Sequence, residues 1–460
     1  MKVLQYSQGR FMKRFITQKI IEWNKQNKKK ALLIDGARQV GKTYSIRAFA
    51  NAHYENFIEI NLLENQDALN MFSKAKTSQE IFVYMSLLFG DKMIPNKTII
   101  FLDEVQECLN IVTVIKFLVE DGRFRYILSG SLLGVEMKNV KSVPVGYMDI
   151  LQMYPMSFAE FCIANGVAQS AIDYLKDCFT NLTPLGEVIH EKFMQLYRLY
   201  LVVGGMPDAV KEYVASNNLS KVLEIQRFLC ENYKADMAKY EKENKPLLST
   251  IFDLIPSELN AQNKRFKFKS IENGGRSKYA EDSFLWLTDA GIALSVYCAN
   301  EPKTPLILSK SRNLLKLFLC DVGLLASMYM NNLQVKILSG EKNINFGSVY
   351  ENAVTQELVS HGLVPYYFNS HKQGELDLIV EIDGEAVPIE IKSGKDYTVH
   401  SALNNVLNVK EYGIKKAYIF NNYNLSVDGN KIYLPVYMSM FFCNTEQGDM
   451  IYKVDLGELK

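Results

Sequence analysis

The chain has 460 residues, 48% apolar and 22% charged, which is typical of a globular protein and argues against extensive disorder. Its 52 basic and 51 acidic residues leave a net charge of +1, so any nucleic-acid binding would depend on a local basic patch. The seven cysteines form no CxxC pair, which argues against both a disulfide framework and a zinc site. No apolar run approaches the ~18 residues of a membrane span and no signal peptide is recognised, so we predict a cytoplasmic protein with no membrane partner.

The N-terminal third alternates between expected helices and strands. An amphipathic helix is predicted over residues 14–27. The apolar runs that we expect to form strands are ALLIDG (31–36), FIEINL (57–62), TIIFLD (98–103), RYILSG (125–130) and MDILQM (148–153). Such alternation predicts an α/β fold with a parallel sheet and helices on both of its faces.

The remaining two thirds divide into three regions. The pattern is helical after residue 163, with a break at LVVGGMP (201–207). Over residues 260–310, a helix followed by a hairpin predicts a small winged-helix module. Residues 311–460 return to mixed α/β. The expected domains are therefore 1–163, 164–259, 260–310 and 311–460.

The stretch GARQVGKT (36–43) matches the pattern G-x-x-x-x-G-K-[ST] between a strand and a helix, as a phosphate-binding P-loop requires. Its glycines let the backbone N–H groups point at phosphate oxygens, and the helix N-terminus adds positive potential. Lys42 would reach the β- and γ-phosphates, and the Thr43 hydroxyl would ligate Mg²⁺. The alternative is a glycine turn beside an ordinary surface lysine. The predicted nucleotide-binding residues are Gly36, Ala37, Arg38, Gln39, Val40, Gly41, Lys42, Thr43 and Tyr44.

Two further strand ends carry polar groups suited to ATP hydrolysis. In TIIFLDEVQE (98–107), Asp103 is predicted to bind Mg²⁺ and Glu104 to polarise the attacking water as a general base. The alternative is a strand end capped by two solvated acids. In RYILSGS (125–131), Ser129 or Ser131 would sense the γ-phosphate, or the small residues simply form a turn. We therefore predict Lys42, Glu104 and Ser129 as the catalytic residues.

Together, GARQVGKT, FLDEVQE, ILSGS, LQMYPMSFAEF and YLVVGGMP, in this order, resemble a prokaryotic family of AAA+-like P-loop ATPases. LFLCDVGLL (317–325) and GSVYENAV (347–354) fit the C-terminal half of that family, whose function is uncharacterised. The resemblance implies ATP binding and hydrolysis but no known substrate. Such ATPases often use an arginine finger, for which Arg198, Arg227 and Arg276 are candidates, while Arg38 lies inside the loop itself.

The stretch GELDLIVEIDGEAVPIEIKSGK (374–395) is predicted to form a hairpin around Asp383-Gly384, a type I′ turn signal. Counting back from the turn pairs Ile382 with Glu385 and Leu378 with Ile389. The same register sets Asp377 against Glu390 and Glu375 against Lys392. Side chains alternate along a strand, so Leu376, Leu378 and Val380 are expected on one face and the charged residues on the other. Two opposed carboxylates need a compensating cation, and a divalent metal would balance them better than Lys392 alone.

This hairpin resembles the PD-(D/E)xK nuclease core, with Asp377 as its first acid and Glu390-Ile391-Lys392 as its ExK. The expected element order around it, αβββαβ, agrees with a restriction-endonuclease-like domain. In that core a glutamate on the first helix often joins the metal site, which points to Glu351. The predicted nuclease-like site is Glu351, Glu375, Asp377, Glu390 and Lys392, with a second Mg²⁺ or Mn²⁺. The alternatives are an exposed charged face or a register slipped by one residue.

The sequence therefore predicts an Mg²⁺-dependent ATPase whose nucleotide state controls a nuclease-like domain acting on DNA. The stretch QNKRFKFKS (262–270), with Phe266 and Phe268 among basic residues, is the best local patch for phosphate contacts. The alternative is an ATP-dependent conformational switch with an inactive C-terminal module that binds another protein or a second copy of the chain.

Overall fold

The computed structural model describes residues 12–26, 29–75, 77–131, 133–136, 146–240, 247–261, 264, 266, 277–329, 332–341, 346–394, 397–445 and 451–454. Of the basic stretch 262–270, only Lys264 and Phe266 are among them. Phe268 and the candidate arginine Arg276 lie outside the described residues.

The N-terminal part is built on a parallel sheet of five strands in the order β2-β3-β4-β1-β5. These strands are β1 (Ala31–Asp35), β2 (Asn56–Asn61), β3 (Thr98–Asp103), β4 (Arg125–Ser129) and β5 (Met148–Gln152). Each matches one of the five expected strands, so the predicted α/β fold with a parallel sheet is confirmed. β1 lies next to β4 and one strand away from β3, so the polar residues at their carboxyl ends share one edge.

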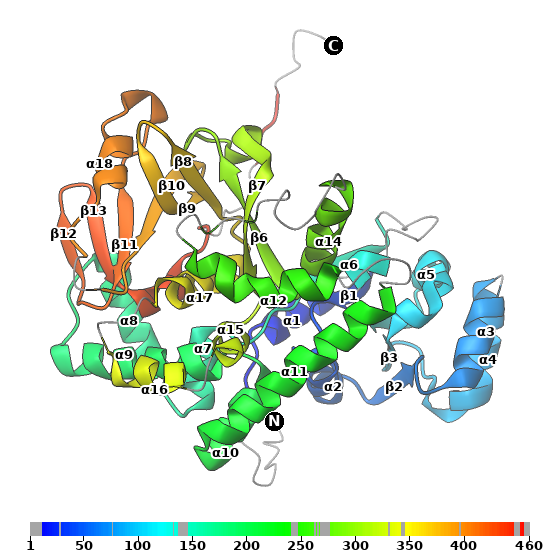
Figure 1. The fold of residues 1–460 in the computed structure, drawn as a ribbon. Helices are drawn as coiled ribbons and strands as arrows, with labels where there is room; N and C mark the ends of the chain where they lie inside the picture. The colour runs from blue at the N-terminus through cyan, green and yellow to red at the C-terminus, as the bar shows by residue number, and fades with distance from the viewer. Residues whose placement is uncertain are drawn as a thin grey trace.

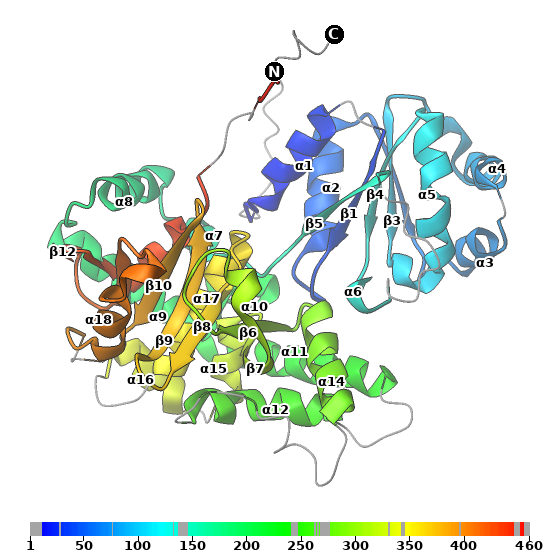
Figure 2. The same cartoon turned by 90° about the horizontal axis from the view of Figure 1, so that it is seen from above.

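Helices cover both faces of this sheet, as Figure 2 shows. The helices and 3₁₀ turns are α1 (Ile16–Lys25), α2 (Lys42–His53), α3 (Gln66–Lys74), α4 (Ser78–Phe89), η1 (Gly90–Lys92), η2 (Val105–Cys108), α5 (Leu109–Asp121) and α6 (Leu133–Glu136). Leu32 of β1 packs in the apolar cluster that contains Phe49 of α2, whereas its neighbour Leu33 packs with Ile115 of α5. Alternation along the strand thus provides each face with its own core.

A helical region follows, and much of it lies along the base of the molecule in Figure 1. Its helices are α7 (Phe158–Ala164), α8 (Gln169–Asn181), α9 (Glu187–Val203), α10 (Pro207–Ser216), α11 (Leu219–Tyr240), α12 (Leu247–Asn260) and α14 (Ser277–Asp289). The predicted break in LVVGGMP is present between α9 and α10. At Gly205 any Cβ atom would overlap the backbone of Met156, and the Gly205 N–H donates to Asp321 Oδ2 at 2.5 Å.

The C-terminal part contains an eight-stranded mixed sheet in the order β12-β13-β11-β10-β9-β8-β6-β7. Its strands are β6 (Ala293–Ala299), β7 (Lys310–Leu319), β8 (Tyr366–Ser370), β9 (Gly374–Ile382), β10 (Glu385–Ile391), β11 (Ala417–Asn421), β12 (Ser426–Asp428) and β13 (Lys431–Pro435). The accompanying helices and 3₁₀ turns are η4 (Leu306–Ser309), α15 (Val322–Met328), α16 (Asn332–Ser339), α17 (Gly347–Ser360), α18 (Ser401–Leu407), η5 (Lys410–Tyr412) and η6 (Val436–Phe441).

The hairpin expected in the winged-helix module belongs to this large sheet. β6 pairs antiparallel with β7 and parallel with β8, so the sheet crosses the expected boundary at residue 310. The hairpin is therefore joined to the C-terminal sheet through β8. A separate winged helix is therefore not confirmed.

The predicted hairpin around Asp383-Gly384 is present in β9 and β10. Both turn residues have positive φ, 51° and 78°, as a type I′ turn requires. Ile382 pairs with Glu385 and Leu378 with Ile389, in the predicted register. The element order α17-β8-β9-β10-α18-β11 is also the expected αβββαβ.

Beyond Leu378 the hairpin differs from the prediction. The β9–β10 pairing ends there, and β10 continues beside β11 while β9 continues beside β8 with a register shift. Leu376 was expected on the face of Leu378 and Val380, but it packs in the opposite cluster with Leu403 of α18. An irregularity in the β8–β9 ladder reverses the face on which the side chains of β9 lie beyond Leu378. Counting residues back from the turn cannot predict such an irregularity.

Candidate functional site

The phosphate loop joins β1 to α2 at the carboxyl edge of the five-stranded sheet. Its backbone takes positive φ at Gly36 (150°), Gln39 (66°) and Gly41 (95°), which curls the chain ahead of the helix. A Cβ atom at Gly36 would overlap the carbonyl oxygen of Met153, so only glycine fits there. The loop geometry is therefore the one that the sequence pattern predicts.

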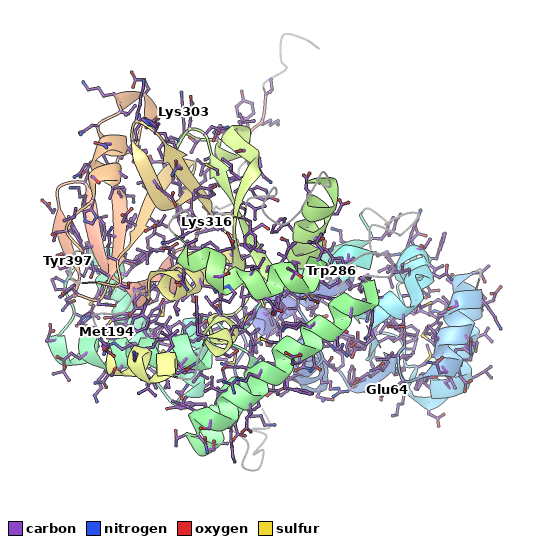
Figure 3. All side chains as sticks on the ribbon, viewed as in Figure 1. Glu64, Met194, Trp286, Lys303, Lys316 and Tyr397 are labelled. Atoms are coloured by element: carbon purple, nitrogen blue, oxygen red, sulfur yellow. The ribbon has the colours of Figure 1, made fainter. Side chains whose placement is uncertain are left out.

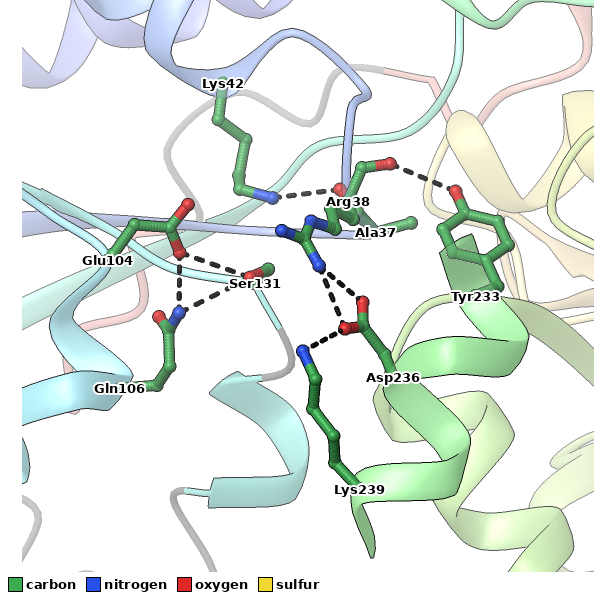
Figure 4. Close-up of polar contacts among 9 residues, drawn as sticks. All are labelled: Ala37, Arg38, Lys42, Glu104, Gln106, Ser131, Tyr233, Asp236 and Lys239. Atoms are coloured by element: carbon green, nitrogen blue, oxygen red, sulfur yellow. Dashed lines mark hydrogen bonds and ion pairs between the residues drawn. The ribbon is translucent and has the colours of Figure 1, made fainter. Parts of the chain in front are cut away.

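Lys42 opens α2 and turns back over the loop. Its Nζ donates to the carbonyl oxygen of Gly36 at 2.7 Å. It also donates to the carbonyl oxygen of Ala37 at 2.9 Å (Figure 4). Burial lowers the pKa of Lys42 to about 8, although the nearby carboxylates of Glu104 and Asp35 act in the opposite direction. A poorly solvated ammonium group at a helix N-terminus is a favourable partner for phosphate oxygens.

Thr43 and Asp103 meet at the end of β3. The Thr43 hydroxyl donates to Asp103 Oδ2 at 3.0 Å, and the Ser129 hydroxyl donates to Oδ1. Burial raises the pKa of Asp103, and the hydrogen bonds from Ser129 and Thr43 oppose that change. A hydroxyl and a buried carboxylate side by side fit Mg²⁺, which takes one or two protein ligands when it binds with a nucleotide.

Glu104 is held next to this pair in a sparsely populated backbone conformation, with φ 56° and ψ 47°. Its Oε2 accepts hydrogen bonds from Gln106 Nε2 at 2.5 Å and from the Ser131 hydroxyl at 3.2 Å (Figure 4). A non-glycine residue in this region is strained, and such strain is often retained at functional sites. Ser131, rather than Ser129, therefore contacts the predicted general base.

Other members of the predicted nucleotide-binding set lie around the same loop. Val40 O accepts a hydrogen bond from Arg14 Nη1 at 2.6 Å, and Tyr44 at the start of α2 is 45% exposed. Ala37 lies against Gly291, where a Cβ atom would come within 2.9 Å of the Ala37 N. Arg38 contacts α11, away from the sheet.

The sequence did not reveal that Arg14 connects the phosphate loop to the start of α7. Arg14 Nη2 donates to Tyr154 O at 2.7 Å, and Arg14 Nε donates to Glu160 Oε1 at 3.2 Å. Glu160 also completes a capping box with Ser157 at the start of α7. The S-x-x-E spacing of that box was a readable signal for a helix start, but its link to Arg14 depends on the tertiary structure.

The predicted C-terminal acids are near one another, and three of the four are paired with a lysine. The Lys264 ammonium contacts the Glu351 carboxylate, and Lys316 Nζ lies 2.9 Å from Glu375 Oε1. Lys392 Nζ lies 2.8 Å from Glu390 Oε1. Glu351 belongs to α17, Lys316 to β7, Glu375 to β9 and Glu390 to β10, while Lys264 follows α12 and Lys392 follows β10.

Asp377 stands at the point where β9 and β10 separate. Its Oδ2 accepts a hydrogen bond from the Ile391 N–H at 2.9 Å, so the carboxylate lies across the opening between the strands. Burial and the charge of Asp377 raise the pKa of Glu390 to about 7, while Lys392 opposes the change. Burial and Asp377 likewise raise the pKa of Glu351, which is 2% exposed.

One part of the predicted acidic site needs correction. Glu375 does not face Lys392, because it pairs with Asn369 of β8, whose Nδ2 donates to Glu375 Oε2 at 2.6 Å. The ammonium group that pairs with Glu375 is that of Lys316, whose side chain is 0% exposed and lies inside the C-terminal part (Figure 3). Within the described ranges, no group of three His, Cys, Asp or Glu side chains is arranged to hold a metal ion.

The comparisons with known proteins divide the chain into three matched regions. Residues 28–162 match a family described as AAA domain. Residues 194–335 and 346–439 each match a family described as a domain of unknown function, DUF8612 and DUF4143 respectively. No curated protein matches the chain at a significant level.

Solved structures with some likeness include the Walker-type ATPase PABY2304 of Pyrococcus abyssi. It is 12% identical, with a TM-score of 0.42, over 70% of this chain and 96% of that one. A second is PCH-2 of C. elegans, 17% identical with a TM-score of 0.22, over 35% of this chain and 44% of that one.

The AAA match spans the loop, β3 and β4, which together carry the groups described above. The match to the AAA domain over residues 28–162 therefore supports a P-loop domain of the ATP-binding type. None of the helices in the described part of the chain combines the length and hydropathy needed to cross a bilayer.

Proposed function

We propose that this protein is an Mg²⁺-dependent ATPase whose nucleotide state controls its C-terminal domain. One observation carries the proposal: Lys42, Thr43, Asp103 and Glu104 meet at one sheet edge although they come from separate segments. Mg²⁺, when bound with ATP, would supply positive charge between the phosphates and Asp103.

The residues of the chain divide the work of hydrolysis. Lys42 holds the phosphate oxygens, and Thr43 and Asp103 hold the cation. Glu104 takes a proton from the attacking water, because a carboxylate within one water of the γ-phosphate can act as a general base. Ser129 orients Asp103 and Ser131 orients Glu104, so both serines are positioning residues.

Measurements of ATP binding and phosphate release test this assignment. Lys42→Ala should abolish both, whereas Glu104→Gln should keep binding and slow turnover by roughly 10²–10⁴-fold. Lys30→Ala is the matched control: Lys30 lies just before β1, outside the loop, and pairs with Asp149 at 2.6 Å. Unchanged turnover in Lys42→Ala would overturn the assignment.

We also propose a second function, a nuclease-like site in the C-terminal domain that acts on DNA with Mg²⁺ or Mn²⁺. It is supported by the αβββαβ order and by the position of Asp377, whose charge, together with burial, raises the pKa of both Glu351 and Glu390. Lys392 lies 2.8 Å from Glu390, at the ExK spacing, where an ammonium group can stabilise charge on a phosphate. A cation would have to compete with the lysines that pair with these acids.

Incubation with linear, circular and branched DNA in Mg²⁺ or Mn²⁺ tests the second function. Cleavage by the wild type that is lost in Asp377→Ala would support it. The absence of cleavage, together with unchanged DNA binding in Asp377→Ala, would refute it. That result would favour the alternative, a switch whose C-terminal module binds another protein or a second copy of this chain.

A further inference from the structure

Arg38, the third residue of the phosphate loop, forms an ion pair outside the ATPase sheet. Its Nη1 lies 2.9 Å from Oδ1 and 2.8 Å from Oδ2 of Asp236 on α11 (Figure 4). The Asp236 side chain is 6% exposed, whereas that of Arg38 is 41% exposed. The carboxylate is thus fixed inside the protein, while the guanidinium group has room to move.

Helix α11 holds the backbone of the loop as well. The Tyr233 hydroxyl donates to the carbonyl oxygen of Arg38 at 3.0 Å, one turn before Asp236. Lys239 Nζ lies 3.0 Å from Asp236 Oδ1, so this carboxylate serves two cations. If Arg38 moved away, the Asp236 carboxylate would therefore still be paired with Lys239.

Arg38 also faces the phosphate-binding space. In Figure 4 its guanidinium group lies near Lys42 and Glu104, with Asp236 on the other side. The electrostatics agree: the Asp236 hydrogen bond is the main cause that raises the pKa of Arg38, and Glu104 contributes as well. The charge of Arg38 in turn lowers the pKa of Lys42. A γ-phosphate placed between Lys42 and Glu104 would therefore compete with Asp236 for Arg38.

We propose that Arg38 senses the nucleotide by exchanging Asp236 of α11 for the γ-phosphate of ATP. The proposal depends on the ATP binding proposed for the loop. ADP lacks the γ-phosphate, so with ADP the pair with Asp236 stays closed and α11 stays tied to the loop. With ATP the pair opens, because Lys239 still pairs with Asp236, whose bond to Arg38 uses Nη1 alone. A phosphate can accept two parallel N–H bonds from the guanidinium group.

Helix α11 is well placed to pass this change on. Lys234 of α11 lies 2.9 Å from Asp253 of α12. At the end of α12, Asn260 Oδ1 accepts a hydrogen bond from the Ser348 hydroxyl of α17 at 2.8 Å. Helix α17 carries Glu351, so polar contacts connect the sensor with the acidic cluster of the C-terminal domain.

Binding of ADP and of the slowly hydrolysed analogue ATPγS to the full chain, with Mg²⁺, tests the sensor. In Asp236→Asn, ATPγS should bind about tenfold more tightly while ADP is unchanged, because Arg38 no longer has to leave a charged partner. In Arg38→Gln, ATPγS should weaken about tenfold and ADP much less. The double variant should behave like Arg38→Gln, since Asp236 acts only through Arg38.

Tyr233→Phe is the matched control, because it removes the hydrogen bond to the loop backbone and leaves the ion pair in place. It should change the affinities for ATPγS and ADP by the same factor. The sensor is refuted if Asp236→Asn changes both nucleotides equally, or if the two substitutions are additive. Binding of neither nucleotide by the wild type would instead refute the proposed ATPase function on which the sensor depends.

Discussion

The Ser131 hydroxyl donates a hydrogen bond to Glu104 Oε2 at 3.2 Å, which links the end of β4 to the residue after β3. Gln106 Nε2 donates to the same oxygen at 2.5 Å. Both donors approach Oε2, so in the proposed reaction Oε1 is the oxygen that would accept the proton from water. The general base of the proposed reaction is thus oriented by a neighbouring strand.

Ser131→Ala should therefore lower kcat about tenfold and leave the affinity for ATP unchanged, because a hydrogen bond to a charged group is worth about 1.5–3 kcal/mol. Steady-state phosphate release and equilibrium ATP binding check this. In a Glu104→Gln background the same serine substitution should have little further effect. An equal loss in both backgrounds would show that Ser131 acts on something other than Glu104.

The stability of the ATPase domain should depend on Lys42. Its folded pKa of about 8 lies below the ordinary 10.5, so the unfolded chain binds more protons between these two values. The wild type should therefore gain stability relative to Lys42→Met as the pH rises from 8 to 10.5, by up to about 3 kcal/mol. Denaturant unfolding of both proteins at pH 7.5 and pH 10.5 measures this gain. A difference that stays constant with pH would contradict it.

The raised pKa of Glu390 should give the stability of the C-terminal part the opposite pH dependence. Its folded pKa of about 7 lies above the ordinary 4.5, so the folded chain binds more protons between these values. The wild type should lose stability relative to Glu390→Gln as the pH rises from 4.5 to 7. Thermal unfolding at both pH values checks the sign. Glu385→Gln, on the same strand and in an exposed pair with Lys415, should show no comparable change.

Lys264 should control access of a cation to the acidic cluster. Lys264→Gln leaves the buried Glu351 without its ammonium partner, so Tm should fall. If the cluster accepts metal, Mn²⁺ should raise the Tm of this variant by more than that of the wild type. Lys415→Gln breaks an exposed pair and should show neither effect. Equal Mn²⁺ responses in all three proteins would exclude Lys264 as a competitor of the metal.

The hairpin of β9 and β10 shows which strand pairings can be predicted from the local sequence. The Asp383-Gly384 turn and the pairing back to Leu378 and Ile389 follow from turn chemistry and period-two alternation, and both were predicted. The partner of Glu375 was predicted wrongly, because the β9–β10 ladder ends at Leu378 and Glu375 pairs with Asn369 of β8. Which strand lies beside a given residue depends on the whole sheet.

The sequence by itself determined the P-loop, the strand ends that carry Asp103 and Glu104, and the element order of the C-terminal domain. These features arise from contacts between residues that are close along the chain. Only the tertiary structure decided that Asp236 holds Arg38, that Ser131 orients Glu104, and that Lys264 and Lys316 pair with acids of the C-terminal part. The reason is physical: a buried charge takes whatever opposite charge the fold brings near it, and that partner can lie anywhere in the sequence.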